Sequence, residues 1–192
     1  MLGPSWSPDG KHILFSRQDG DTGYQILIMD ADGGNLHELL HIDACFMCAQ
    51  PRWTPDGQHI VFYHHPDLFI VNPDGQNLRQ LTNFMEVYNV SAVFHDRYGF
   101  PEYAITSDSQ RLVYTMGYPT QMVEMDLTPD GWKTRRIILP DVRMMLLAPD
   151  DQSVFVQDDF HNLTRINLQM GTADATIANA LDPVILAVPS PS

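Results

Sequence analysis

A short motif recurs along this chain, and it constrains the fold more than any other feature. The segments WSPDGKHILFS and WTPDGQHIVFY begin at Trp6 and Trp53, and degenerate copies place Ile105 and Leu147 at the position of the tryptophan. Successive copies are separated by roughly 40–50 residues, the length of one supersecondary unit in several repeat architectures. The sequence therefore predicts a repeat protein with four visible units.

The motif has the composition of a tight turn between two strands. Proline fixes the second turn position, serine or threonine suits the first, and glycine takes the last, so residues 7–10 and 54–57 favour a type I turn. The apolar runs that follow, residues 13–15 and 60–62, are too short for helices and rich in strand formers. Such runs are typical of inner strands that are buried on both faces.

Each unit continues with a second hairpin, in which another apolar run, a turn and a half-polar segment follow one another. Four antiparallel strands per unit match a propeller blade. We predict an all-β fold, a partial or small β-propeller with four four-stranded blades and an additional C-terminal strand, in which Trp6 and Trp53 pack between blades. The single domain would contain blades at residues 1–42, 48–83, 91–139 and 142–179 and the extra strand at residues 183–188.

These residues resemble a known repeat. WSPDGKHILFS followed by ILIMDADGGNLHELL is similar to the repeat of TolB-like, or WD40-like, β-propellers, which are also found in prolyl-oligopeptidase-type peptidases and oligogalacturonate lyases. The resemblance is closest over residues 3–82, less regular over 105–139 and faint over 143–178. It implies a module rather than an activity, because propellers carry unrelated functions. The peptidases use a separate hydrolase domain with a Gly-x-Ser-x-Gly elbow, a motif that this sequence lacks.

The charge of the chain limits its partners. There are 11 Lys and Arg residues against 24 Asp and Glu residues, a formal net charge of −13. A field of this sign repels nucleic acid and anionic membrane surfaces and favours basic partners. No apolar run reaches the roughly 18 residues of a membrane span, and we expect no signal peptide because the N-terminus enters a blade at once. The periplasm and the cytoplasm both stay open as compartments.

The predicted topology gathers irregular segments at one end of the blades, opposite the regular acidic turns. Loops that meet at a channel mouth commonly carry function. The long link 83–104 combines aromatic, basic and acidic side chains, which suits recognition of a peptide or carbohydrate. The alternative is a packed insertion in which Arg97 pairs with Asp96 or Glu102. The predicted ligand-binding residues are His64, His65, His95, Asp96, Arg97, Tyr98, Glu102 and Tyr103.

A metal site is a second prediction for this end. His41, Cys45 and Cys48 have a His-x3-Cys-x2-Cys spacing, and one Cys-x2-Cys is half of a zinc site. His64 and His65 could supply further ligands. The sequence leaves three interpretations open, namely zinc, a local disulfide or redox pair, and plain buried thiols, and it predicts no other cofactor.

The motifs favour a binding module over an enzyme. The sequence lacks a nucleophile elbow, a complete metal triad and a phosphate loop. We therefore expect a non-catalytic β-propeller scaffold that recognises a protein or peptide through its irregular loops. The alternatives are a metal-assisted polysaccharide lyase or hydrolase and the propeller portion of a larger peptidase. The apolar segment 183–188 predicts either ring closure or a homo-dimer through unpaired blade edges.

Overall fold

The computed structural model is all-β and contains no helix in the part of the chain that it describes. No helix able to cross a membrane occurs in that part. The described residues are 2–20, 23–43, 48–83, 102–116, 121–127, 134–138, 142–158, 161–170 and 172–177. The predicted extra strand at 183–188 lies outside them.

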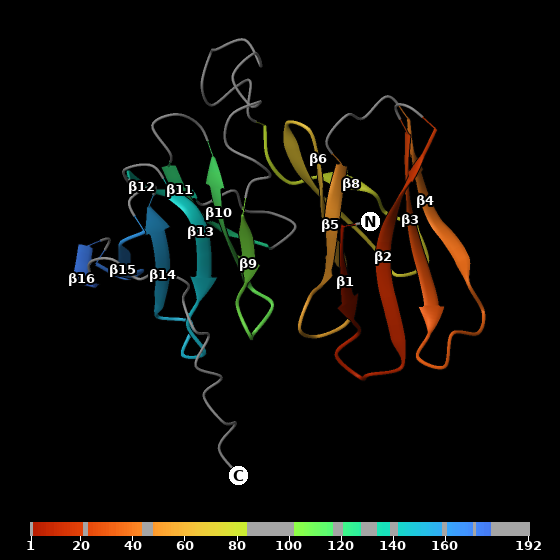
Figure 1. Cartoon of the computed structure of the whole chain (residues 1–192), viewed down its shortest axis with the longest axis horizontal. Helices are drawn as coiled ribbons and strands as arrows, with labels where there is room; N and C mark the ends of the chain where they lie inside the picture. The colour runs from red at the N-terminus through yellow and green to blue at the C-terminus, as the bar shows by residue number, and fades with distance from the viewer. Residues whose placement is uncertain are drawn as a thin grey trace.

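Four antiparallel sheets follow one another along the chain, and each is built from four consecutive strands (Figure 1). The first sheet contains β1 (Leu2–Trp6), β2 (His12–Asp19), β3 (Gly23–Asp30) and β4 (His37–Ile42), and the second contains β5 (Cys48–Trp53), β6 (Ile60–His64), β7 (Asp67–Val71) and β8 (Arg79–Gln80). The third contains β9 (Tyr103–Ile105), β10 (Arg111–Met116), β11 (Gln121–Asp126) and β12 (Thr134–Ile138), and the fourth contains β13 (Val142–Leu147), β14 (Ser153–Asp158), β15 (Leu163–Asn167) and β16 (Thr172–Ile177). The predicted all-β class is thus confirmed.

The hydroxyl and the aspartate of the repeated motif hold the first turn in three of the four sheets. In the second sheet, the Thr54 hydroxyl donates to Asp56 Oδ1 at 2.6 Å and accepts from the backbone N–H of His59 at 3.0 Å. The N–H of Gly57 closes the turn on the Thr54 carbonyl at 2.8 Å. Ser7 in the first sheet and Thr106 in the third make the same bonds, whereas Ala148 takes this position in the fourth. These bonds explain the residue types of the motif.

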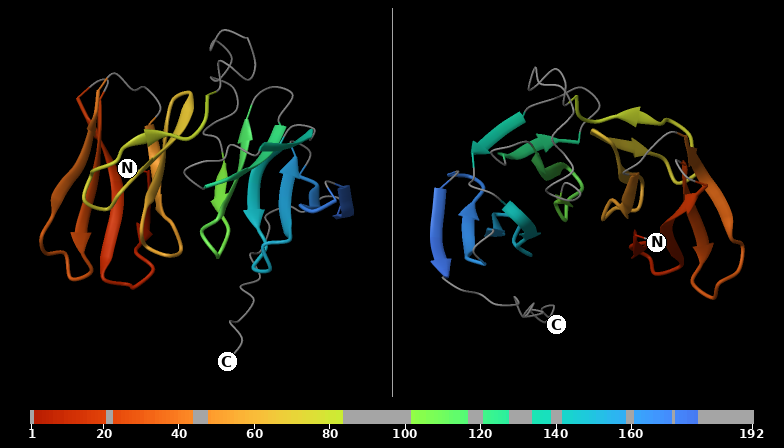
Figure 2. Two further views of the ribbon diagram at one scale, coloured as in Figure 1. Left: turned by 180° about the vertical axis from the view of Figure 1, so that it is seen from behind. Right: turned by 45° about the horizontal axis from the view of Figure 1, so that its top comes forward.

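The sheets stack face to face in chain order and follow an arc (Figure 2). We call the spaces between consecutive sheets the first, second and third junctions. Each junction has its own buried core. Leu14, Ile26, Ile42, Ile60, Phe62 and Val71 fill the first; Val61, Tyr63, Leu68, Tyr103, Leu112 and Val123 lie in the second; Val113, Met122, Val154, Val156, Ile166 and Leu168 fill the third. Alternate residues of β6 and β10 face opposite junctions, as the period of a strand requires.

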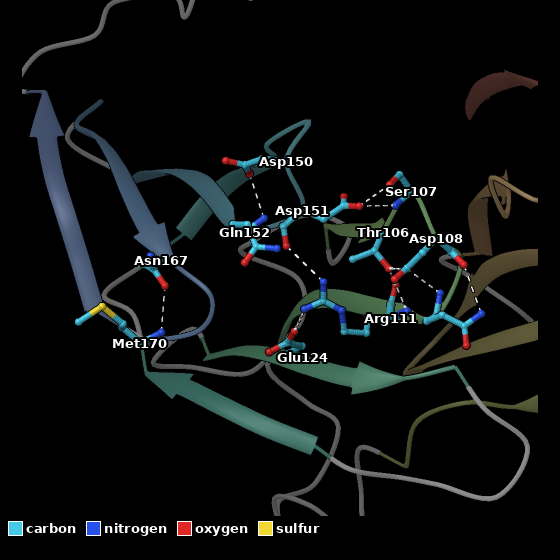
Figure 3. Close-up of polar contacts among 11 residues, drawn as sticks. Thr106, Ser107, Asp108, Arg111, Glu124, Asp150, Asp151, Gln152, Asn167 and Met170 are labelled. Atoms are coloured by element: carbon cyan, nitrogen blue, oxygen red, sulfur yellow. Dashed lines mark hydrogen bonds and ion pairs between the residues drawn. The ribbon is translucent and has the colours of Figure 1, made fainter.

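Hydrogen bonds between neighbouring turns strengthen two of these junctions. The backbone N–H of Asp56 donates to the Ser109 hydroxyl across the second junction at 2.9 Å. The backbone N–H of Ser107 donates to Asp151 Oδ2 across the third at 2.8 Å (Figure 3). At the first junction, Gly57 lies opposite Pro8, which has no N–H to donate.

The two motif tryptophans have different surroundings. Trp53 packs against the core of the first junction, which confirms its predicted role. The prediction is wrong for Trp6, which is 59% exposed. Trp6 is paired with Ile13, whereas the next residue, Leu14, faces the second sheet. Trp6 therefore lies on the face of the first sheet that no other described sheet covers.

Candidate functional site

The strands end in two sets of connections, which we call the turn end and the loop end. The turn end carries the motif turns at residues 7–10, 54–57, 106–109 and 148–151. The loop end carries the opposite strand ends, including His64, His65 and the start of β9 at Tyr103. The predicted ligand-binding residues that the structure describes all lie at the loop end.

A bulge in β5 shapes this end of the second junction. The register of β5 against β6 shifts between Ala49 and Arg52, and Gln50 within the shift has a φ of 59°. Such a backbone angle is uncommon for a residue other than glycine and is a feature of bulges that redirect side chains. The Gln50 carbonyl accepts a hydrogen bond from the Tyr103 hydroxyl, which also donates to the Val61 carbonyl at 3.0 Å. Tyr103 thereby fixes the third sheet to the second.

Arg52 lies against the same tyrosine. Its Nη1 donates to the Tyr103 carbonyl at 2.8 Å, and its guanidinium carbon is 4.9 Å from the centroid of the Tyr103 ring. This geometry combines a hydrogen bond with a cation–π contact. The guanidinium is therefore held in one place at the loop end.

Glu102 adds a half-buried carboxyl beside Arg52. Its backbone is fixed by Thr115, whose N–H donates to the Glu102 carbonyl at 2.9 Å and whose hydroxyl accepts from the Glu102 N–H at 3.1 Å. Burial raises the pKa of the Glu102 carboxyl, and the positive charge of Arg52 opposes part of that rise. The Glu102 carboxyl therefore keeps its proton to a higher pH than an exposed glutamate does.

One buried acceptor in this region has no hydrogen-bond partner among the residues that the structure describes. The side-chain oxygen Oε1 of Gln50 is buried and makes no hydrogen bond within the described structure. Buried polar atoms in native proteins are nearly always satisfied, so an orphan acceptor points to a missing donor. We call Gln50, Arg52, Glu102 and Tyr103 the loop-end cluster.

The two adjacent histidines point to different neighbours. His65 Nδ1 lies 2.9 Å from the Tyr63 hydroxyl, and Tyr63 belongs to the same buried core as Tyr103. The His64 ring instead packs on Phe69, with 5.3 Å between ring centroids. Burial lowers the pKa of His64, and the neighbouring His65 adds to this effect. The structure thus brings His65, Glu102 and Tyr103 to the second junction and turns His64 toward the first.

The predicted metal ligands are described only in part. His41 lies 3.1 Å from Asp43 and 3.8 Å from both Asp19 and Glu38. Cys48 is paired with His64 in the β5–β6 ladder, but its side chain is not among those described. Cys45 lies outside the described residues, as do His95, Asp96, Arg97 and Tyr98. Within the described residues no group of three His, Cys, Asp or Glu side chains could hold a metal ion.

Sequence reasoning missed two members of the loop-end cluster, Gln50 and Arg52. Both lie just before the motif turn at residues 54–57, where the residue types show no catalytic or binding pattern. A glutamine and an arginine on either side of Pro51 were the available signal, because proline within a strand is typical of edges and bulges.

No family model and no curated protein sequence matches this chain, but solved structures do. TolB from Acinetobacter baumannii is 16% identical with a TM-score of 0.67, over 88% of this chain and 41% of TolB. An oligogalacturonate lyase from Vibrio parahaemolyticus is 13% identical with a TM-score of 0.65, over 93% of this chain and 53% of the lyase. An oligogalacturonate lyase in complex with manganese is 14% identical with a TM-score of 0.66, over 90% of this chain and 52% of the lyase. This chain therefore shares the fold of the matched parts and spans about half the length of these proteins or less.

Proposed function

We propose that this chain forms part or all of a β-propeller that binds a protein or peptide at its loop end. Four-stranded sheets that stack face to face in an arc support the propeller architecture, as does the likeness to TolB and to oligogalacturonate lyases. The fold suits both a binding protein and an enzyme, so the choice between them depends on the chemistry of the site.

The loop-end cluster carries the proposal of binding. Arg52 offers donors, Glu102 offers a carboxyl, and Gln50 Oε1 is a buried acceptor without a donor among the described residues. Arginine held rigidly at a protein surface is among the residue types that contribute most to binding between proteins.

Selection from a library of short random peptides displayed on phage tests this proposal. Peptides enriched on the immobilised chain should bind the Arg52→Gln variant at least about tenfold more weakly, a loss of about 1.4 kcal/mol. The matched control is Arg165→Gln, because Arg165 also makes side-chain hydrogen bonds, to Ser153 in the fourth sheet. Circular dichroism of both variants establishes that they are folded. Peptides that bind Arg52→Gln and the unmodified chain equally would contradict the proposal.

Incubation with oligogalacturonate and Mn²⁺ tests the lyase alternative. Elimination within the uronate chain creates a carbon–carbon double bond that absorbs ultraviolet light. We expect no such absorbance from this chain. Turnover that depends on added Mn²⁺ would replace the binding proposal with the enzymatic one.

A further inference from the structure

The first junction is hollow at the turn end, far from the loop-end cluster. A pocket of about 480 Å³ lies between the first and second sheets, and its wall includes the motif turns of both. This volume falls within the range of roughly 300–1,000 Å³ that is typical of small-molecule sites. The proposed peptide binding does not use this end of the molecule.

Two carboxylates make the pocket acidic. Hydrogen bonds from the Ser7 hydroxyl and the Lys11 N–H lower the pKa of Asp9. Burial alone would raise the pKa of Asp56, but hydrogen bonds from Thr54 and Gln58 lower it overall. Both groups are therefore anionic at neutral pH. Lys11 lies 3.6 Å from Asp9, whereas Asp56 has no basic side chain within ion-pair distance in the described structure.

Two histidines add hydrogen-bond acceptors to the same wall. His37 Nδ1 lies 2.7 Å from the carbonyl oxygen of Asn35, and His12 Nδ1 lies 3.1 Å from Asp30 Oδ1. A carbonyl or carboxylate oxygen only accepts, so Nδ1 carries the proton in both rings. In the neutral imidazoles Nε2 is then left as an acceptor. Carboxylates and imidazole Nε2 atoms together favour a ligand that is rich in donors.

Apolar side chains complete the wall. Ile28, Trp53 and two prolines line the pocket beside the carboxylates. Trp53 packs against the core of the first junction, and its Nε1 is buried without a partner among the described residues. Apolar contacts therefore hold the indole ring in place. Tryptophan is also the aromatic residue that attracts cations most strongly.

The absence of a side chain at Gly57 keeps the pocket open. A Cβ at this position would lie 3.8 Å from Pro8, which is ordinary contact distance. The equivalent position in the fourth sheet is Asp151, whose carboxylate accepts from Ser107 across the third junction at 2.8 Å (Figure 3). A smaller cavity of about 200 Å³ between the third and fourth sheets is lined by Arg111, Glu124, Gln152, Leu168 and Gln169.

We propose that the pocket at the first junction binds an organic cation, that is, an ammonium or guanidinium group on a short apolar stem. The cation would lie near Asp56, and the stem would pack along Ile28 and Trp53. Such a group could belong to a free amine or to a lysine or arginine side chain of another protein.

Agmatine, which carries both kinds of cation on a butyl stem, is the first probe, and N-butylurea is its neutral control. Titration calorimetry should show binding of agmatine but not of N-butylurea, and the Trp53 indole N–H signal should shift in nuclear magnetic resonance spectra. Asp56→Asn should weaken binding about tenfold. The matched control Asp108→Asn changes the same turn position in the third sheet and should leave the affinity unchanged.

A second pair of variants tests the position of the ligand. Gly57→Asn should abolish binding by filling the pocket, because asparagine tolerates the left-handed backbone better than most residues do and Gly57 has a φ of 71°. Gly10→Asn is the control, since Gly10 has a φ of 70° and open space around it.

A capped arginine peptide distinguishes the two sources of the cation. Binding of the peptide but not of agmatine, with the same response to the four variants, would assign the pocket to a protein side chain. If neither probe binds, or if Asp56→Asn and Asp108→Asn change the affinity equally, the proposal is overturned.

Discussion

The first and third junctions occupy equivalent places in the repeat, yet their turn ends differ. At the third junction, Arg111 is 2.7 Å from Glu124 and also donates to the Asp151 carbonyl at 3.3 Å. Figure 3 shows these contacts together with the Ser107–Asp151 bond. At the first junction, Pro8, His12 and Gly57 take the places of Ser107, Arg111 and Asp151, and a pocket lies between the sheets.

The difference shows that one set of residues determines the backbone of the turns, and another determines whether a junction holds a pocket or a polar contact. The turn bonds of Thr54 and Thr106 are alike, so both turns present the same backbone. What lies between the sheets depends on the second and fourth turn positions and on the first residue of the next strand. Glycine and proline there leave space, whereas serine and aspartate join the sheets.

The largest expected loss of stability follows from removing Trp53 at the first junction. Trp53→Ala should lower the free energy of unfolding by about 3 kcal/mol, because it removes a large side chain from an inter-sheet core. Trp6→Ala changes the same motif position on the uncovered face and should cost about 0.5 kcal/mol or less. Urea denaturation measures both values. Equal losses would mean that the two tryptophans have equivalent surroundings.

Substitution of Arg111 at the third junction should have the next largest effect on the free energy of unfolding. Arg111→Ala leaves the Glu124 carboxylate, whose side chain is 13% exposed, without its cation. We expect a loss of about 2 kcal/mol in the free energy of unfolding. Adding Glu124→Gln to this variant should recover part of the loss, because it removes the unpaired charge. A double variant no more stable than Arg111→Ala would show that the charge of Glu124 is unimportant.

The motif turn of the fourth sheet can be stabilised by a substitution. Ala148 occupies the position of Thr54 and Thr106. Its turn therefore lacks a side-chain hydroxyl that could donate to Asp150. Ala148→Ser should raise the free energy of unfolding by about 1 kcal/mol through the missing hydrogen bonds. Thr106→Ala, the reverse change in the third sheet, should lower it by a similar amount. A thermal melt of each variant measures the shifts, and a destabilised Ala148→Ser would exclude the expected geometry.

The smallest effect is a pH dependence shared by the motif aspartates. Hydrogen bonds from Thr106 and Gln110 lower the pKa of Asp108 below its ordinary value of 3.8, and the pKa of Asp56 is lowered as well. The folded state therefore holds the anion more tightly than the unfolded state, and the stabilisation present above pH 3.8 is lost as the pH falls through the folded pKa. Asp56→Asn and Asp108→Asn should each make the acid limb of the stability curve shallower.

Denaturation series at neutral and acidic pH measure this slope for both variants. Without a ligand the two should behave alike, although Asp56 lines the pocket at the first junction and Asp108 belongs to the turn of the third sheet. A much larger change in Asp56→Asn would mean that the first junction contains a further charge coupled to that carboxylate.

Local rules were enough to predict the motif turns and the apolar strands that follow them in the two regular copies. Proline, aspartate and glycine after Trp6 and Trp53 determine the turn whatever lies beside it, and the apolar runs that follow form β2 and β6. The surroundings of Trp6 could not be predicted in this way. The tryptophan of the motif packs against a core at one copy and is exposed at the other, because its burial depends on which sheet lies next to it.

The candidate sites were less accessible to sequence reasoning. Glu102 and Tyr103 were predicted from their residue types, but the orphan acceptor of Gln50 arises from a bulge that only the three-dimensional pairing reveals. The pocket at the first junction requires Gly57 to face Pro8, two residues far apart in the sequence. A weak signal for the pocket came only from comparing the four copies of the motif, in which the fourth turn position is glycine in two copies and serine or aspartate in the others.

The division of the interior into three separate cores has a consequence for how the molecule opens. Each core joins only neighbouring sheets, so cooperativity passes from sheet to sheet as in a linear repeat array. The second and third sheets each have two covered faces, whereas the first and fourth each have one among the described sheets. Backbone amides of β2 and β14 should therefore exchange with deuterium through smaller fluctuations than those of β6 and β10. We therefore expect the arc to loosen from its end sheets inward, with the second and third sheets opening last.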